Sequence, residues 1–290
     1  MRFSYTESMC DPSFYLPLAQ AAEEAGFSTY LVPDSLCYPA VSDSKYPYTP
    51  TGDREFLEDK PFLEPFSLIP AMAAVTKRLR FATFVLKLPV RTPVLVAKSA
   101  SSVAVLSNER FSLGIGISPW PEDFVVSFQP WSTRGERTDE MIAIIRGLMT
   151  GAFYEFHGAH YELPRIKIGP VPKRPMPILV GGHSEAALRR AARLADGWMH
   201  AGGSPQELER CIARLAALRR AYQRESEPFE IHASSLDAYK LDGVRRLADL
   251  GITDLVIGFQ NPYTKQADTQ SLEAKVDALR RYAERVIAKY

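Results

Sequence analysis

Residues 177–198 read PILVGGHSEAALRRAARLADGW and contain a strand, a turn, a helix and the start of another strand. The turn carries Gly181 and Gly182, which let the backbone approach a ligand closely because no Cβ stands in the way. A helix that begins near Ser184 points its free N–H groups and the positive end of its dipole at that turn, which favours an anion. The segment therefore predicts either a phosphate site or an ordinary strand-to-helix turn.

The same alternation of strand and helix continues along the whole chain. Apolar runs predict eight strands, at Arg2–Thr6, Ser28–Pro33, Leu79–Leu86, Phe111–Ile117, Met176–Val180, Gly197–Ala201, Phe229–Ser234 and Asp254–Phe259. Helices are predicted between and after them, at Pro12–Ala25, Phe66–Thr76, Pro93–Leu106, Gly135–Met149, Ser184–Leu194, Pro205–Arg224, Leu241–Leu250 and Gln270–Lys289. Residues Phe153–Leu163 predict a small hairpin that turns at Gly158.

Eight such units predict an α/β fold, a parallel (β/α)8 TIM barrel that forms a single domain over residues 1–290. Long insertions are expected after the second and fourth strands, and both would lie on the functional face of the barrel. An open doubly wound sheet also alternates strands and helices. Eight units in a chain of 290 residues favour the closed barrel.

Composition excludes several classes of protein. The net charge is +1 and charges of both signs are interspersed, which argues against nucleic-acid and membrane partners. The N-terminal sequence does not fit a signal peptide. Three widely spaced cysteines, Cys10, Cys37 and Cys211, suit a reducing cytoplasm, where we expect the protein.

Polar residues at the C-terminal ends of the strands are the candidates for a site in such a barrel. Asp34 ends the second strand, where its carboxylate would contact a cofactor ring, act as a base or cap the next segment. Ser35 would position a substrate or serve as a turn residue, and no Gly-x-Ser-x-Gly motif surrounds it to make it a nucleophile.

Histidines and aromatic residues allow two interpretations each. His200 and His232 lie on neighbouring predicted strands and could meet at the barrel mouth, although structural histidines are favoured. No histidine or cysteine spacing has the pattern of a metal site, so we predict no metal. Aromatic residues of the insertions could line an apolar pocket or, as we favour, attach a long loop to the surface: Tyr38, Tyr46, Tyr48, Phe56, Phe62 and Trp120.

Four motifs together resemble the luciferase-like monooxygenase superfamily, and specifically its branch of oxidoreductases that depend on coenzyme F420, a deazaflavin. The resemblance covers about Met1 to Lys289. The motifs are VPDS at Val32–Ser35, LRFATFVL at Leu79–Leu86 with Pro89, Arg91 and Pro93, LSNERFSLGIG at Leu106–Gly116, and Pro177–Gly182 with Ser184 and ADGW at Ala195–Trp198.

The resemblance implies a barrel of the bacterial-luciferase type that binds a flavin or deazaflavin at its C-terminal mouth. It implies a non-proline cis peptide bond at Phe84–Val85 behind the cofactor ring and a phosphate site at Gly181–Ser184. The implied cofactor-binding residues are Asp34, Thr83, Phe84, Val85, Ser118, Gly181, Gly182, His183, Ser184 and His200. Asp34 and Ser35 are the candidate catalytic residues, and Tyr38 and Trp120 the candidate substrate contacts.

The sequence departs from the family pattern at three positions. Many F420-dependent members have a histidine where this chain has Ser35, and a glutamate of related sugar-phosphate dehydrogenases is replaced by the Ser118–Pro119 region. Sugar-phosphate oxidation is therefore not expected. Lys87 stands where some relatives have a small polar residue, and it would contact an acidic cofactor tail or simply end its strand.

We expect hydride transfer between F420 and a small organic substrate. Two alternatives remain open: an FMN-dependent monooxygenase that uses oxygen, and a non-catalytic flavin-binding protein on the same barrel. A flavin or F420 reductase would supply reduced cofactor, and a homodimer is the expected assembly.

Overall fold

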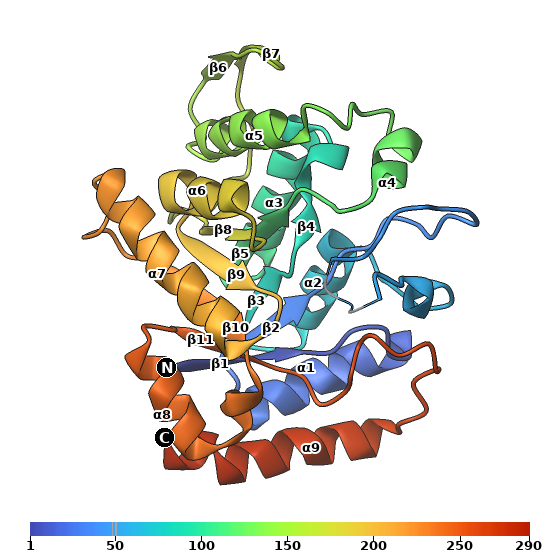
Figure 1. Cartoon of the computed structure of the whole chain (residues 1–290). Coiled ribbons are helices and arrows are strands. Elements are labelled where there is room, and N and C mark those ends of the chain that lie inside the picture. Colours follow the sequence, from blue (N-terminus) through green and yellow to red (C-terminus); the bar gives the residue numbers. More distant parts are fainter. Residues whose placement is uncertain (48, 50) are drawn as a thin grey trace.

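The chain folds into a closed parallel barrel surrounded by helices (Figure 1). The computed structural model describes residues 1–47, 49 and 51–290, so Tyr48 and Pro50 lie outside the described residues. The barrel strands are β1 (Arg2–Thr6), β2 (Thr29–Val32), β3 (Arg80–Thr83), β4 (Leu86–Lys87), β5 (Phe111–Gly116), β8 (Ile178–Gly181), β9 (Gly197–His200), β10 (Glu230–Ser234) and β11 (Asp254–Ile257). The order β3-β2-β1-β11-β10-β9-β8-β5-β4, with β3 also paired to β5, closes the sheet. The predicted TIM barrel is confirmed.

The predicted third strand, Leu79–Leu86, is broken in the middle. β3 pairs with β5 through Phe81 and Phe111, and β4 pairs with the same strand through Leu86 and Ile115. The two pieces thus occupy one position of the barrel, which keeps eight positions in total. The peptide bond between Phe84 and Val85 in the break is cis, as the resemblance implied.

Helices cover the outside of the barrel. They are α1 (Tyr15–Glu24), α2 (Pro65–Ala74), α3 (Pro93–Leu106), α5 (Arg134–Leu148), α6 (Glu185–Leu194), α7 (Pro205–Ala221), α8 (Leu241–Asp249) and α9 (Leu272–Arg285). A short helix that was not predicted, α4 (Pro121–Val126), lies in the insertion after β5. The expected hairpin forms from β6 (Tyr154–His157) and β7 (Glu162–Ile166), and it projects beyond α5 (Figure 1).

Side chains alternate along the strands between two apolar layers. One face packs on the helices, where Tyr5, Tyr30 and Phe81 are fully buried. The other face fills the barrel interior with a small cluster of Leu31, Ala82, Leu179, Met199 and Val256, on which Phe84 and Val85 pack. None of the helices in the described part of the chain is long and apolar enough to cross a membrane.

Charged side chains close the N-terminal end of the barrel. The Arg2 guanidinium donates to both oxygens of Asp254, at 2.8 and 2.6 Å, and lies 2.7 Å from Glu230. His232 Nε2 lies 2.9 Å from Glu230 Oε2, so this histidine belongs to the closed end. His200 and His232 do not meet at the barrel mouth, because His200 pairs with Ala233 and one residue along a strand reverses the direction of the side chain.

Candidate functional site

A large cavity opens at the C-terminal ends of the strands. Its volume is about 1250 Å³, and residues that follow β1, β2, β3, β5, β8, β9, β10 and β11 line it. The two long insertions contribute to its walls through Tyr46, Phe56 and Trp120. A cavity of this size can hold a tricyclic cofactor together with a substrate, since drug-sized ligands occupy pockets of roughly 300–1000 Å³.

One wall of the cavity is the turn between β8 and α6, which has the features of an anion site. Gly182 has a φ of +112°, a conformation that favours glycine, and a Cβ there would lie 3.0 Å from the Ala187 side chain. Ser184 caps α6 by accepting a hydrogen bond from the Ala187 N–H at 3.2 Å. The open end of the helix therefore faces a cavity that Gly181 to Ser184 all line.

A cation that the sequence did not suggest lies in the same cavity. Arg134 begins α5, lines the cavity, and stacks its guanidinium 3.6 Å from the centre of the Trp131 ring. Its Nη1 donates to the Trp131 carbonyl, whereas its Nε is buried and has no hydrogen-bond partner among the residues that the structure describes. Burial lowers the pKa of Arg134 from its usual value. Arg134 therefore places a positive charge in the lining of the same cavity as Gly181–Ser184, and such a charge favours a bound phosphate.

Val85 packs directly against two glycines of the barrel wall, and its side chain forms a shelf at the bottom of the cavity. A Cβ on Gly116 would lie 2.7 Å from one Val85 methyl, and a Cβ on Gly181 would lie 2.9 Å from the other. The valine therefore rests directly on two positions that admit only glycine without rearrangement. Phe84 and Val85 both line the cavity, where the resemblance placed the back of a cofactor ring.

Asp34 lines the cavity but both of its oxygens are occupied. Its carboxylate accepts from Arg91 Nη1 at 2.9 Å and Nη2 at 3.0 Å, and from the Lys87 backbone N–H at 2.8 Å. The Asp34 side chain is only 2% exposed. This geometry fixes β4 and the segment after it, and it leaves no oxygen of Asp34 directed at a ligand. Ser35 also lines the cavity.

Lys87 and Ser118 are held by one buried carboxylate. Lys87 Nζ lies 2.8 Å from Asp123 Oδ2, and the Ser118 hydroxyl donates to the same oxygen at 2.6 Å. Ser118 also accepts from the Trp120 N–H at 3.1 Å. Both residues line the cavity, but their polar groups are used to attach the unpredicted helix α4 to the barrel.

Glu7 is a candidate that sequence reasoning missed. It follows β1, lines the cavity and is 5% exposed. Its Oε2 accepts from the Tyr5 hydroxyl at 2.8 Å, and its Oε1 lies 3.2 Å from Lys275 Nζ. Burial raises the pKa of Glu7 from its usual value, against the lowering effect of Lys275. The available signal was its position directly after a strand at the C-terminal face.

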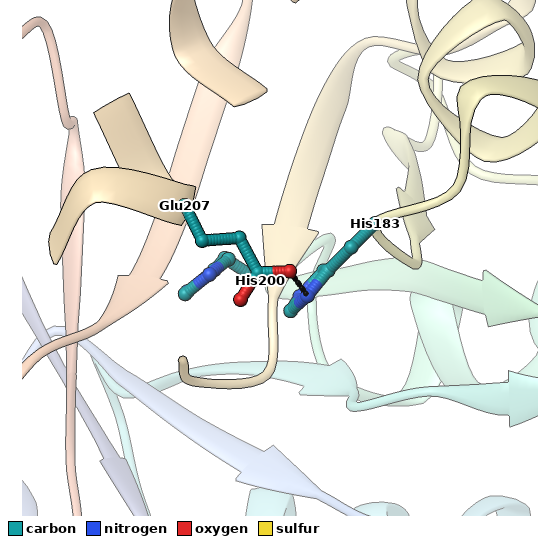
Figure 2. Close-up of side chains that lie close together, drawn as sticks. All are labelled: His183, His200 and Glu207. Atoms are coloured by element: carbon teal, nitrogen blue, oxygen red, sulfur yellow. Dashed lines mark hydrogen bonds and ion pairs between the residues drawn. The ribbon is translucent and has the colours of Figure 1, made fainter. Parts of the chain in front are cut away.

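His183, His200 and Glu207 form a compact group beside the anion site (Figure 2). His183 Nδ1 lies 3.2 Å from Glu207 Oε1, and the two imidazole rings stack with centres 4.3 Å apart and planes 11° apart. Burial, together with His183, lowers the pKa of His200 to about 4, and burial also lowers that of His183. The donor atoms lie within 4.8 Å of one another, but the stacked rings hold their in-plane lone pairs in two separate parallel planes, so this arrangement does not direct both at one ion.

The aromatic residues of the insertions pack mainly on one another. Tyr46 stacks on Trp120 with ring centres 5.4 Å apart, and Arg54 lies 4.3 Å from the centre of the Trp120 ring. Tyr263, which follows β11, completes the cluster by packing against Tyr46 and Phe56 at 5.8 and 5.3 Å. The insertion after β2 is thereby attached to two other loops over the cavity.

Three candidates from the sequence lie outside the cavity surface. The Thr83 hydroxyl donates to the Gly114 carbonyl at 2.6 Å and is buried in the barrel. His200 is fully buried behind His183. Tyr38 contacts the Arg54 guanidinium, 5.8 Å from its ring centre, and is not among the cavity residues.

Comparison with known proteins identifies the family. The model of the luciferase-like monooxygenase family matches residues 4–284, so the chain belongs to this family. An uncharacterized protein of Mycobacterium tuberculosis strain H37Rv is 57% identical over 289 residues, which is 100% of both chains. The crystal structure of the monooxygenase RslO1 from Streptomyces bottropensis has the same fold, with a TM-score of 0.75 and 18% identity over 100% of both chains.

Relatives with named activities match about half of the chain. An F420-dependent glucose-6-phosphate dehydrogenase of Amycolatopsis mediterranei is 33% identical over 144 residues, 48% of this chain and 43% of its own. The pyrimidine monooxygenase RutA of Variovorax paradoxus is 30% identical over 151 residues, 50% of this chain and 40% of its own. The family thus contains both F420-dependent and monooxygenase members.

Proposed function

We propose that the protein is an F420-dependent oxidoreductase that transfers a hydride between the deazaflavin and a small organic substrate. The observation that carries the proposal is Glu7, a buried carboxyl with a raised pKa in the same cavity as the anion site. Reduction of a carbonyl or imine requires a proton as well as a hydride, and a carboxyl whose pKa is raised by burial is suited to supply it.

The residues of the cavity fit the cofactor in two places. Gly181–Ser184 and Arg134 would hold its phosphate, since a helix N-terminus and an unpartnered buried guanidinium N–H favour that charge. Val85 would support the ring from behind, and it lies too close to Gly116 and Gly181 to sink further. When bound, the reduced deazaflavin supplies the hydride.

The chain's own residues would contribute proton transfer and exclusion of water. The Glu7 carboxyl would donate its proton to the substrate oxygen or nitrogen as the adjacent carbon is reduced, and would recover a proton after product release. Ser35 would orient the substrate through its hydroxyl. Asp34 acts in this proposal through Arg91 and the Lys87 backbone, by fixing the segment that carries the shelf.

Fluorescence titration of the cofactor-free protein with F420 and FMN side by side tests the cofactor. A preference for F420 is expected, and turnover is then measured by the absorbance change of reduced F420 with ketones, enones and imines. Glu7→Gln should retain F420 affinity and lower turnover by about 10²- to 10⁴-fold, the range for general acid catalysis. The exposed Glu24→Gln is the control and should change neither quantity.

An FMN-dependent monooxygenase is the second candidate, and the similarity to RutA favours it. Preferential binding of FMN, with oxygen uptake in the presence of a flavin reductase, would replace the F420 proposal by this one. Binding of neither cofactor would contradict both.

A further inference from the structure

Glu7 belongs to a buried cluster whose members come from three separate parts of the chain, and Glu7 is the member that lines the cavity. Glu7 follows β1, Lys275 lies on α9, and Asp268 lies in the segment between β11 and α9. Lys275 Nζ lies 2.7 Å from Asp268 Oδ2 and 3.2 Å from Glu7 Oε1. The Lys275 side chain is 1% exposed, so this ammonium is almost completely removed from water.

The cluster contains one cation and two carboxyl groups. If both carboxyls were ionised, one buried negative charge would remain without a partner, which is costly in an interior of low dielectric. Asp268 has the shorter contact with the ammonium, and it also accepts from the Gln260 amide at 2.8 Å and from the Gln270 N–H at 3.0 Å. Within the described part of the chain, Glu7 accepts from the Tyr5 hydroxyl as its one donor besides Lys275.

The two carboxyl groups are therefore driven apart in acidity. Burial opposes ionisation of Asp268, but the hydrogen bonds from Lys275 and Gln260 prevail and lower its pKa, whereas burial raises the pKa of Glu7. Such a separation assigns the proton to one member of a carboxyl pair. Neighbouring groups do not alter this result, because burial raises the pKa of Tyr5 well above its usual value and that of Cys10 to about 12.

We propose that Lys275 and Asp268 are positioning residues: Lys275 holds the Glu7 carboxyl in place at the cavity lining, and Asp268 offsets the ammonium charge so that Glu7 can keep its proton. Asp268 neutralises most of the ammonium charge, so that Lys275 holds Glu7 by a weaker contact without forcing it to ionise. This inference rests on the proposed function only for the use of that proton, since the cluster is formed by the chain's own side chains.

The same segment also carries a wall of the cavity. Tyr263 packs in the aromatic cluster over the cavity, and Asp268 lies five residues later on the same connection to α9. The backbone carbonyl of Gln266 accepts from Lys60, which attaches this segment to the insertion after β2. The connection between β11 and α9 therefore carries both Tyr263, which packs over the cavity, and Asp268, which influences the charge state of Glu7.

Two substitutions that remove charges of opposite sign test the proposal. Asp268→Asn removes the neighbouring negative charge and should lower the pKa of Glu7 by about one unit. Lys275→Met removes the positive charge and should raise it by about one unit. A structural role alone would not give opposite shifts, so the direction of each change is the decisive result. Glu284→Gln, an exposed change on the same helix, is the control.

Infrared titration of the cofactor-free protein provides the readout. The band of protonated Glu7 is identified by its loss in Glu7→Gln, and its midpoint is followed with pH in each variant. If Lys275→Met does not fold, Lys275→Arg is measured in its place. Lys275→Arg keeps the positive charge, so its Glu7 midpoint should equal that of the wild type. Shifts in the same direction, or no shift in Asp268→Asn, would overturn the proposal.

The pH profile of turnover supplies a second readout and separates the two proposals. The part of the pH profile of turnover that depends on Glu7 should shift by the same amount as the infrared titration midpoint of Glu7 in each variant. If F420 does not bind while the midpoints diverge, the proposed function fails and the charge cluster stands. If F420 binds and turns over while the midpoints do not diverge, the cluster proposal fails alone.

Discussion

Gly181→Ala offers a direct test of the shelf formed by Val85. The new Cβ would lie 2.9 Å from one Val85 methyl and 3.3 Å from the other. Favourable carbon–carbon contacts lie at about 3.5–4.0 Å, so the valine has to move by roughly 0.5–1 Å. Val85 already packs closely on Gly116, since a Cβ built there would lie 2.7 Å from one of its methyls, so little room is left in that direction. The remaining direction is into the cavity.

Movement of Val85 into the cavity should reduce the affinity for the ligand. Extra methyl groups in a close-packed site cost about 1–3 kcal/mol, and every 1.4 kcal/mol of binding free energy is about tenfold in affinity. We therefore expect Gly181→Ala to weaken cofactor binding by about 5- to 150-fold. Val85→Ala should remove the contact, so the double variant should recover most of the lost affinity.

Fluorescence titration of the wild type, both single variants and the double variant forms a complete cycle. Thermal unfolding of the same four proteins shows how much of the cost appears as lost stability. Unchanged affinity in Gly181→Ala would refute the reasoning, and so would a double variant that binds as weakly as Gly181→Ala.

Three further predictions concern the surroundings of the site. His200 has a pKa of about 4 in the folded protein and about 6.5 in the unfolded chain. The free energy of unfolding should therefore fall by about 3 kcal/mol as the pH drops from 6.5 to 4. Urea unfolding at several pH values measures this change, which should be smaller in His200→Asn. Arg91→Met leaves the buried Asp34 carboxylate without its partner and should cost about 3–5 kcal/mol of stability, while Asp34→Leu with Arg91→Met should recover much of it. Ser184→Ala and Ser271→Ala each remove a helix cap and should each cost about 1 kcal/mol, but calorimetry should show weaker cofactor binding only for Ser184→Ala.

The barrel could be predicted because each of its strands has a local signal. Strands buried on both faces are continuous apolar runs, and the helices between them begin and end at recognisable residues such as Ser184 and Gly26. The break at Phe84–Val85 came only from the resemblance, since LRFATFVL reads as one uninterrupted strand. α4 was missed because it is six residues long and lies between two prolines and a polar turn.

The site was less predictable because contacts between distant segments decide its chemistry. The sequence places Asp34 at a strand end, but only the fold shows that Arg91 occupies its carboxylate. Glu7 carries no motif, and its chemistry depends on Lys275, which lies 268 positions away in the chain. Residues Gly181–Ser184 line the cavity. This could be predicted because the local order of strand, turn and helix places them at the C-terminal face of the barrel.

Pairing of β1 with β11 has a consequence for synthesis of the protein. The first strand finds its second neighbour only when residues 254–257 exist, with Arg2 opposite Asp254 and Tyr5 opposite Ile257. At roughly 5–20 residues per second, a nascent chain waits on the order of 13–50 s for that strand. During this time the barrel remains open and its strand edges are available to other chains. Glu7 meets Lys275 only after closure, so a prematurely terminated chain lacks this part of the cavity.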